Sequence, residues 1–262
     1  MQNYSSFTFL AVEKQSNYLI LQLNRGKANA LHQSMIDELS QFFDVALKDS
    51  QVAGVLMTGK DHFFSGGVDL TEVYFYDSEA IKHFWGSFLQ LATQMLAFSK
   101  PLVAAISGHS PAGGCIMALA CDYRIMASDE KYQIGLNEIA VGIAPRASIL
   151  HLYSSLLGQR KAYQYLLEGK LLSPQQALKD GLVDSLADLK DLKKQAQKKM
   201  ETYLKLPPKA FRQTKTTLRQ ELLQQMQANR TEELNQLHEQ LMSKESKLIM
   251  GKVVEYLQSN KK

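Results

Sequence analysis

The sequence has few cysteines and no long apolar run, and these absences narrow the possible classes of protein. Its 262 residues include only two cysteines, Cys115 and Cys121, which fit neither a zinc-ligand spacing nor a disulfide framework. We expect both to be buried as small hydrophobic side chains. No apolar run reaches the roughly 18 residues that a membrane-spanning helix needs, and residues 1–9 lack the layout of a secretory signal or a mitochondrial transit sequence. We therefore expect a cytoplasmic protein that does not bind membranes.

The chain also has little excess charge, but that charge is unevenly distributed. The formal net charge is +4, yet the segment from Lys190 to the end has 16 Lys and Arg against 8 Asp and Glu. A basic region of this kind can bind nucleic acid, anionic lipid or a phosphorylated small molecule. Because few aromatic residues lie between these charges, we interpret the region as solvated helical surface and expect no nucleic-acid partner.

Short apolar runs alternate with helical patterns in the first two-thirds of the chain, which predicts an α/β fold. Residues Tyr18–Asn24 and Val52–Thr58 have the length and β-branched content of buried strands. Between them, Ser34–Lys48 places its apolar residues on one helical face. A strand, a helix and a strand in this order predict a crossover unit of a parallel sheet. The alternation of strands and helices continues. The predicted elements are a helix over 79–98, a strand over Leu102–Ser107, a helix over Ala112–Ala120, a strand over Asp122–Ala127 and a short strand over Tyr132–Ile134.

After about residue 145 the pattern contains no further strand and predicts helices only. We expect short helices over Ala147–Leu157, Gln159–Leu167 and Pro174–Lys179, and mainly helical structure over 190–204 and 208–258. Six apolar residues form a stripe in the last of these segments: Leu218, Leu222, Met226, Leu234, Leu237 and Leu241. Such a stripe is typical of a face that packs on the sheet domain or on another subunit.

A glycine-rich turn, Phe63–Leu70 (FFSGGVDL), follows the predicted strand at 52–58. Its adjacent glycines, Gly66 and Gly67, allow positive φ values or the close approach of a ligand. Asp69 is a suitable N-cap for a helical turn after them. Taken alone, this segment is typical of many ordinary turns.

A second glycine-rich turn, Ser107–Ile116 (SGHSPAGGCI), follows the predicted strand at 102–107 and opens a predicted helix. The free amides and the positive dipole end of such a helix start stabilise negative charge on a ligand. The segment is neither a GxGxxG fingerprint nor a phosphate loop, which argues against dinucleotide and ATP chemistry. If one N–H from each turn points at the same oxygen, the two donors form an oxyanion hole, and loss of one such donor typically lowers the rate by about 10²–10³.

Several segments resemble the crotonase superfamily of enoyl-CoA hydratases and isomerases: FFSGGVDLTEV, SGHSPAGGCIMALACDYRIMA, YQIGLNEIAVGIAP and LNRGKANAL. The resemblance extends from about residue 10 to about residue 250 and is closest to the Δ3,Δ2-enoyl-CoA isomerases of the mitochondrial type. It implies an acyl-CoA substrate and a spiral of β-β-α units over residues 1–200. It also implies a C-terminal helical region over 201–262, through which subunits form a trimer or a hexamer of two trimers.

The resemblance further implies roles for individual residues. The backbone amides of Val68 and Gly113 would form the oxyanion hole for the thioester oxygen, and Glu138 would be the catalytic carboxylate. The residues expected to bind the substrate are Arg25, Lys27, Ser65, Gly66, Gly67, Asp69, Leu70, His109, Gly114 and Asn137. Arg25 and Lys27 suit the phosphates of CoA. Three lysines near the C-terminus are further candidates for contacts with CoA: Lys244, Lys247 and Lys252.

A single carboxylate favours isomerisation over hydration. Hydratases of this superfamily use two glutamates, and the position of the first is occupied here by Ile116, which transfers no proton. Moving a double bond needs only one base, which removes a proton from C2 and returns it at C4. We expect burial to raise the pKa of Glu138 for this task. Four apolar neighbours are expected to supply that burial: Leu136, Ile139, Val141 and Ile143.

Other reactions and roles stay open at this point. The predicted isomerisation requires no metal and no redox cofactor, since CoA is part of the substrate. The alternatives are hydration, dehydration or decarboxylation of another acyl-CoA, and acyl-CoA binding without catalysis. Ser65 and His109 are residue types of a nucleophile and a base, but the chain has no GxSxG elbow, and His109 is interpreted as lining the pocket. By the family pattern Asp122 is structural, and Asn137 either orients Glu138 or forms a turn.

Overall fold

The main sheet has six strands, and it forms the centre of the fold. The structure is a computed structural model and describes residue 4 and residues 6–259. The strand order is β1-β2-β3-β5-β7-β9, with β1 antiparallel to β2 and every other neighbouring pair parallel. The strands are β1 (Leu10–Gln15), β2 (Tyr18–Leu23), β3 (Gly54–Thr58), β5 (Leu102–Ile106), β7 (Tyr123–Ala127) and β9 (Ser185–Ala187). All five residues of β5 are buried, as expected for a parallel strand covered on both faces.

A second, three-stranded sheet lies beside the main one. It consists of β4 (His62–Phe63), β6 (Gly108–Pro111) and β8 (Ile134–Gly135), in that order and all parallel. Each of these short strands follows a long strand of the main sheet, so that β3 leads into β4, β5 into β6 and β7 into β8. Helices follow each pair, which makes the chain a spiral of β-β-α units. The predicted fold class is therefore confirmed.

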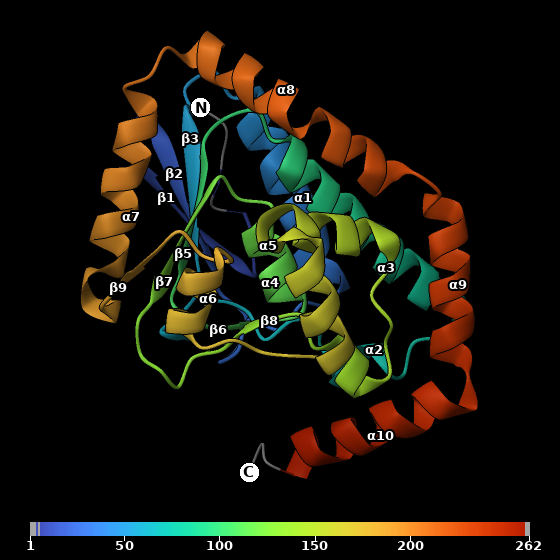
Figure 1. Cartoon of the computed structure of the whole chain (residues 1–262). Helices are drawn as coiled ribbons and strands as arrows, with labels where there is room; N and C mark the ends of the chain where they lie inside the picture. The colour runs from blue at the N-terminus through green and yellow to red at the C-terminus, as the bar shows by residue number, and fades with distance from the viewer. Residues whose placement is uncertain (1–3, 5, 260–262) are drawn as a thin grey trace.

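Eleven helical elements surround these sheets in the described part of the chain. They are α1 (Gln33–Lys48), α2 (Leu70–Val73), α3 (Ser78–Ala97), α4 (Gly113–Leu119), the 3-10 helix η1 (Glu138–Val141), α5 (Ala147–Glu168), α6 (Pro174–Asp180), α7 (Leu189–Leu204), α8 (Pro208–Gln227), α9 (Arg230–Met242) and α10 (Lys244–Ser259). Figure 1 shows α7 on one side of the main sheet and α1, α3, α4 and α5 on the other. Among the described residues, no helix combines the length and the apolar character needed to cross a membrane.

The prediction that no strand follows residue 145 is wrong. A strand does occur after residue 145, because β9 pairs with β7 at the edge of the main sheet. Its three residues, Ser185–Ala187, are too few to produce a recognisable pattern. By contrast, the predicted division between Ala147–Leu157 and Gln159–Leu167 is confirmed, because α5 consists of two helical segments that meet at a kink where Gly158 has a non-helical backbone.

The last three helices form an arm around the outside of the molecule, as Figure 1 shows in orange and red. Helix α8 packs on α3 and α5, α9 packs on α3, and α10 returns to contact α2 and η1. The expected boundary between residues 200 and 201 falls inside α7, so this arm begins with α8. Within the predicted apolar stripe, Met226, Leu237 and Leu241 are buried, whereas Leu218 is 77% exposed.

A buried ionic cluster attaches α8 to the main sheet. The carboxylate of Asp122 accepts hydrogen bonds from the Leu102 amide and from Lys215 Nζ, both at 2.7 Å. Arg219 Nη2 lies 2.9 Å from the other carboxylate oxygen. Lys215 also donates to the backbone oxygen of Lys100. Each partner is thereby satisfied, which is what buried charges require, and Asp122 has a structural role.

Candidate active site

The first glycine turn is held in place by the segment that precedes α1. The Leu31 amide donates to Gly67 O at 2.7 Å, and the Gly66 amide donates to Ala28 O at 2.7 Å. The Asp69 amide in turn donates to Leu31 O at 2.8 Å. Between these bonds, the amide of Val68 has no acceptor among the described residues. The turn therefore presents one free backbone donor from a firmly held loop.

Two buried polar side chains shape this turn from behind. The Ser65 hydroxyl donates to Asn29 O at 2.9 Å and accepts from the Gly67 amide at 3.2 Å. The side-chain amide of Asn29 donates to the backbone oxygens of Phe63 and Phe64, both at 3.2 Å. Ser65 thus supports the loop and does not line the pocket in front of it.

The second glycine turn contains a backbone conformation that L-residues rarely adopt. Ala112 has φ 47° and ψ −117° and is the N-cap of α4. Such conformations persist only where neighbouring interactions enforce them, and here the Ala112 amide donates to Gly135 O at 2.8 Å. Gly113 is the first residue of α4, and its amide has no acceptor in the part of the chain that the structure describes. The turn presents a second free donor at a helix N-terminus.

The two turns are in direct van der Waals contact. A Cβ atom added to Gly67 would lie 3.1 Å from Pro111 O and 3.3 Å from Gly113 N. A Cβ atom added to Gly113 would lie 3.5 Å from the Cα atom of Gly67. Gly67 also has φ +82°, where other residues are strained. The two glycines therefore allow an approach that brings both free amides to the same wall of the site.

Glu138 lies in an apolar environment on another wall of the same cavity. It is the first residue of η1 and is 9% exposed, and its Oε2 atom is buried without a hydrogen-bond partner. Burial raises the pKa of Glu138 to about 7, because the ionised form loses its hydration. A carboxylate with such a pKa can both accept and return a proton near neutral pH.

The turn that carries Glu138 is gripped by the C-terminal arm. Gly142 ends η1 in a left-handed conformation, and the Ile143 amide donates to Glu138 O at 3.0 Å. The hydroxyl of Ser246 donates to Gly142 O at 2.9 Å. A Cβ atom at Gly142 would lie 3.4 Å from Ile249. Helix α10 therefore holds the catalytic candidate in position.

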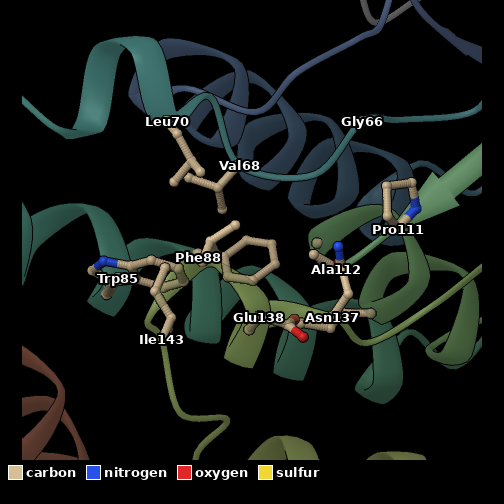
Figure 2. A pocket seen from close by; sticks show the side chains of 13 residues that line it. Gly66, Val68, Leu70, Trp85, Phe88, Pro111, Ala112, Asn137, Glu138 and Ile143 are labelled. Carbon is tan, nitrogen blue, oxygen red and sulfur yellow. The ribbon is translucent and has the colours of Figure 1, made fainter. Parts of the chain in front are cut away.

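These groups surround one pocket with a volume of about 110 Å³. Figure 2 shows Val68 and Leu70 approaching from one side, Glu138 and Asn137 on the opposite side, and Phe88 between them. The lining residues are Gly66, Val68, Leu70, Trp85, Phe88, Pro111, Ala112, Gly113, Ile116, Asn137, Glu138, Val141 and Ile143. Glu138 is the one carboxylate in this lining. The residues that carry the two free amides and the buried carboxylate thus line the same, mostly apolar space.

Six of the predicted site residues line this pocket: Gly66, Val68, Leu70, Gly113, Asn137 and Glu138. Gly67 and Gly114 lie behind the lining, and a Cβ atom at Gly114 would lie 2.5 Å from Ser65 O. Of the apolar neighbours expected around Glu138, Val141 and Ile143 lie in the lining. Ile139 instead is 45% exposed, because it lies on the outer side of η1.

Other predicted residues lie outside the lining. The guanidinium of Arg25 is engaged by Asp69 at 2.7 Å and by Glu72 at 3.5 Å. Asp69 also caps α2 by accepting from the Thr71 amide. These contacts give Arg25 and Asp69 a role in fastening the first turn, whereas Lys27 is exposed on the surface.

His109 and the C-terminal lysines are also separate from the pocket. The His109 ring packs against Phe63 and Tyr132, with ring centroids 5.1 Å and 5.5 Å away. His109 is therefore not among the residues that line this pocket, because its ring packs within the small sheet. Three α10 lysines are exposed on the arm: Lys244, Lys247 and Lys252.

The sequence-based prediction missed several lining residues. Trp85 and Phe88 lie on α3, and they belong to an apolar face that is typical of any buried helix. Pro111 and Ala112 lie in the second turn. Their position directly before Gly113 and Gly114 was the signal that could have identified them as lining residues. The positive φ of Ala112 has no signature in its residue type.

The raised pKa of Glu138 predicts a pH-dependent effect on stability. Between pH 4.5 and about 7 the unfolded chain releases this proton while the folded chain keeps it, so the contribution of Glu138 to stability falls as the pH rises through that window. Replacing Glu138 with Gln removes this effect. The variant should therefore gain about 3 kcal/mol in free energy of unfolding relative to the wild type between pH 4.5 and pH 8. Urea denaturation at both pH values measures the difference, and an equal difference at both would contradict the buried, protonated carboxylate.

Fold and site together define a class of protein: a spiral of β-β-α units with two free backbone amides and a single buried carboxylate at one apolar pocket. Known proteins are similar to this chain. Residues 13–261 match the family model described as enoyl-CoA hydratase/isomerase. The mitochondrial enoyl-CoA delta isomerase 1 of Mus musculus is 33% identical over 208 residues, which are 79% of this chain and 72% of that protein. The 2,3-dehydroadipyl-CoA hydratase of Escherichia coli is 34% identical over 178 residues, 68% of each.

A solved structure shows the same relationship in three dimensions. The human mitochondrial delta3-delta2-enoyl-CoA isomerase superposes with a TM-score of 0.91 at 25% identity, and the match covers 97% of this chain and 100% of that one. The chain belongs to the enoyl-CoA hydratase/isomerase family, the crotonase family of acyl-CoA enzymes. The resemblance noted in the sequence is therefore confirmed.

Proposed function

We propose that this protein is a Δ3,Δ2-enoyl-CoA isomerase. The observation that carries the proposal is that Glu138 is the one carboxylate in the described lining. Ile116, which by the family resemblance stands at the place of a second acid, lies in the same lining. A hydratase needs one group to activate water and another to manage the proton at the α-carbon, whereas a double-bond shift needs one base. The similarity to the isomerases of mouse and human supports this choice.

In the proposed reaction, the thioester oxygen of a 3-enoyl-CoA lies between the amides of Val68 and Gly113. Glu138 removes a proton from C2, which both the thioester and the neighbouring alkene acidify. The electrons of the broken C–H bond delocalise into a dienolate, whose charge collects on the thioester oxygen and is stabilised by the two donors. The protonated Glu138 then delivers the proton to C4, and the product is the 2-enoyl-CoA. The same carboxylate is regenerated, and the proposed reaction needs no separate cofactor, since CoA is part of the substrate. By family resemblance we also propose that the protein works as a trimer or hexamer.

Hydration is the second candidate function, because the hydratase of Escherichia coli is similar at 34% identity. Incubation of the purified protein with 3-hexenoyl-CoA separates the two. We expect 2-hexenoyl-CoA to form rapidly, while crotonyl-CoA is hydrated at a rate at least about 100-fold lower, since a missing general acid or base typically costs 10²–10⁴ in rate. Rapid hydration of crotonyl-CoA without formation of 2-hexenoyl-CoA would overturn the isomerase proposal.

A further inference from the structure

Helix α10 contacts both halves of the site, although it lies outside the pocket. It packs on α2, which follows the first glycine turn, and on η1, which carries Glu138. In Figure 1 it forms the end of the C-terminal arm and passes below α2. No residue of α10 belongs to the described lining of the pocket. Any effect of α10 on the site therefore acts through these two neighbours.

The contact with η1 is a hydrogen bond to the turn that ends it. Ser246 is 4% exposed, and its hydroxyl donates to Gly142 O at 2.9 Å. The side-chain amide of Gln240 on α9 donates to the same oxygen at 3.4 Å. The carbonyl of Gly142 and the amide of Ile143 belong to one planar peptide group, and that amide donates to Glu138 O at 3.0 Å. One rigid peptide thus connects the Ser246 hydroxyl to the backbone of Glu138.

The contact with α2 depends on a glycine in the interior of α10. Gly251 lies within Lys244–Ser259, where glycine is less favourable than alanine. A Cβ atom at Gly251 would lie 3.1 Å from the hydroxyl oxygen of Tyr74, which is the C-cap of α2. Helix α2 begins at Leu70, two residues after the free amide of Val68. The glycine therefore lets α10 lie directly against the element that follows this amide.

The titratable groups around Glu138 are few. It is the one titratable side chain in the described lining of the pocket. Behind it, burial raises the pKa of Cys115 on α4 and the pKa of Tyr153 on α5, so both stay neutral near pH 7. Arg146 keeps its charge and donates to Gln240, and the charged side chains of α10 are exposed. A changed pKa of Glu138 in a variant therefore reports the hydration of its own site.

We propose that α10 fixes the distance between the Glu138 turn and the Val68 turn, and that Ser246 is the residue that positions Glu138. The proposal rests on the isomerase function, in which one carboxylate serves both C2 and C4 of a bound substrate. Such a base tolerates little displacement, because a misplacement of about 1 Å can cost roughly 10²-fold in rate. Ser246 touches no reacting atom and acts through the Gly142 peptide.

Removal of the Ser246 hydroxyl tests the contact with η1. In Ser246→Ala, kcat for 3-hexenoyl-CoA should fall about fivefold, the factor that one hydrogen bond typically contributes. KM should stay within about twofold, because the lining of the pocket is unchanged. Ser259→Ala is the matched control, since its hydroxyl also donates to a backbone oxygen, Tyr256 O at 2.9 Å, but at the exposed end of α10. This variant should leave kcat within about twofold.

The pH profile separates positioning from a general loss of folded protein. A looser turn admits water to Glu138, which should lower its pKa from about 7 and move the midpoint of the kcat/KM profile to lower pH. A smaller folded fraction lowers kcat without moving that midpoint. If Ser246→Ala keeps the wild-type kcat, or lowers it with an unchanged midpoint, Ser246 does not position Glu138 and the proposal is overturned.

The contact with α2 is tested by crowding it and then relieving the crowding. In Gly251→Ala the new Cβ atom would meet the Tyr74 hydroxyl at 3.1 Å, whereas the nearest ring carbons would lie at ordinary distances of 3.6 Å and 3.7 Å. Because α10 and α2 must then move apart slightly, we expect kcat to fall about fivefold. Tyr74→Phe removes the colliding atom, so the double variant should have a kcat within about twofold of Tyr74→Phe alone. An unchanged kcat in Gly251→Ala, or no recovery in the double variant, contradicts the proposal.

A stability measurement keeps this proposal separate from the proposed function. If the wild type isomerises no 3-enoyl-CoA, the proposed function fails, and urea denaturation decides about Ser246. The fall in stability that Glu138 causes between pH 4.5 and pH 8 is the difference between the wild type and Glu138→Gln. It should be smaller in the Ser246→Ala background, because a hydrated carboxylate has a lower pKa in the folded chain. A fall of equal size in both backgrounds would overturn the positioning role.

Discussion

Replacing Glu138 with Gln should lower kcat for the isomerisation of 3-hexenoyl-CoA by about 10⁴-fold, the upper end of what one acid–base group contributes. The glutamine side chain has nearly the same shape, so it fits the apolar site without a new cavity. It accepts no proton from C2, and no other carboxylate in the described lining replaces it. A single-turnover assay that follows the conjugated 2-enoyl thioester by its ultraviolet absorbance measures the effect.

Two controls separate chemistry from folding and binding. Glu130→Gln changes an exposed glutamate and should leave kcat within about twofold, as is usual for a surface substitution. Glu138→Gln should retain affinity for the saturated hexanoyl-CoA, because the two backbone donors and the apolar lining remain. A variant that retains a tenth or more of the wild-type kcat would show that another group moves the proton.

The pH profile provides an independent measure of the same residue. With a pKa of about 7 in the free protein, Glu138 is mostly protonated at pH 6 and mostly ionised at pH 8. Since the reaction begins with the ionised form, kcat/KM should rise about tenfold from pH 6 and level off above pH 8. A profile that is flat between pH 5 and pH 8 would indicate a carboxylate with an ordinary pKa, and therefore a hydrated site.

The long elements of this fold are visible in the sequence because each has its own periodicity. The helix at Gln33–Lys48 places one apolar face on the sheet, and the buried strands at Tyr18–Leu23 and Leu102–Ile106 are nearly continuous apolar runs. The short strand β4 has only two residues, which is too few for any periodicity, whereas β8 overlaps the short strand predicted over Tyr132–Ile134. The existence of β4 depends on contacts with the neighbouring units of the spiral, which local sequence does not encode.

The candidate site also combines features that the sequence indicates with features that only the folded structure shows. The glycines after two strands indicate two turns, the family resemblance implies the amides of Val68 and Gly113, and both residues lie in the pocket lining. The binding role of Arg25 is expected from the resemblance of its segment and from its charge, whereas its guanidinium is paired with Asp69, 44 residues away. Likewise, Trp85 and Phe88 belong to the site only because α3 lies across the second turn. Long-range partners of this kind require the folded structure.

The contact between the two glycine turns leads to the second large effect. In Gly67→Ala, the new Cβ atom would lie 3.1 Å from Pro111 O, 3.2 Å from the Ala112 side chain and 3.3 Å from Gly113 N. These contacts are tighter than ordinary van der Waals packing, and the neighbours are mostly backbone, so the turns must separate by a few tenths of an ångström. A donor displaced from a developing oxyanion loses most of its stabilising effect. We therefore expect kcat to fall by about 10²–10³ with a small change in KM.

Gly67 also has φ +82°, so the variant is strained as well as crowded, and a matched control is required. Gly181 has φ +84°, and the nearest atom to an added Cβ is Leu156 O at 3.9 Å. Gly181→Ala therefore introduces the same backbone strain at the end of α6, far from the pocket, without a collision. Gly181→Ala should lose about 1 kcal/mol in free energy of unfolding, Gly67→Ala should lose about 1–3 kcal/mol more because of its collisions, and only Gly67→Ala should lose activity. If Gly67→Ala folds and keeps the wild-type kcat, the amides at the contact between the turns do not stabilise the transition state, and the oxyanion must be bound elsewhere in the pocket.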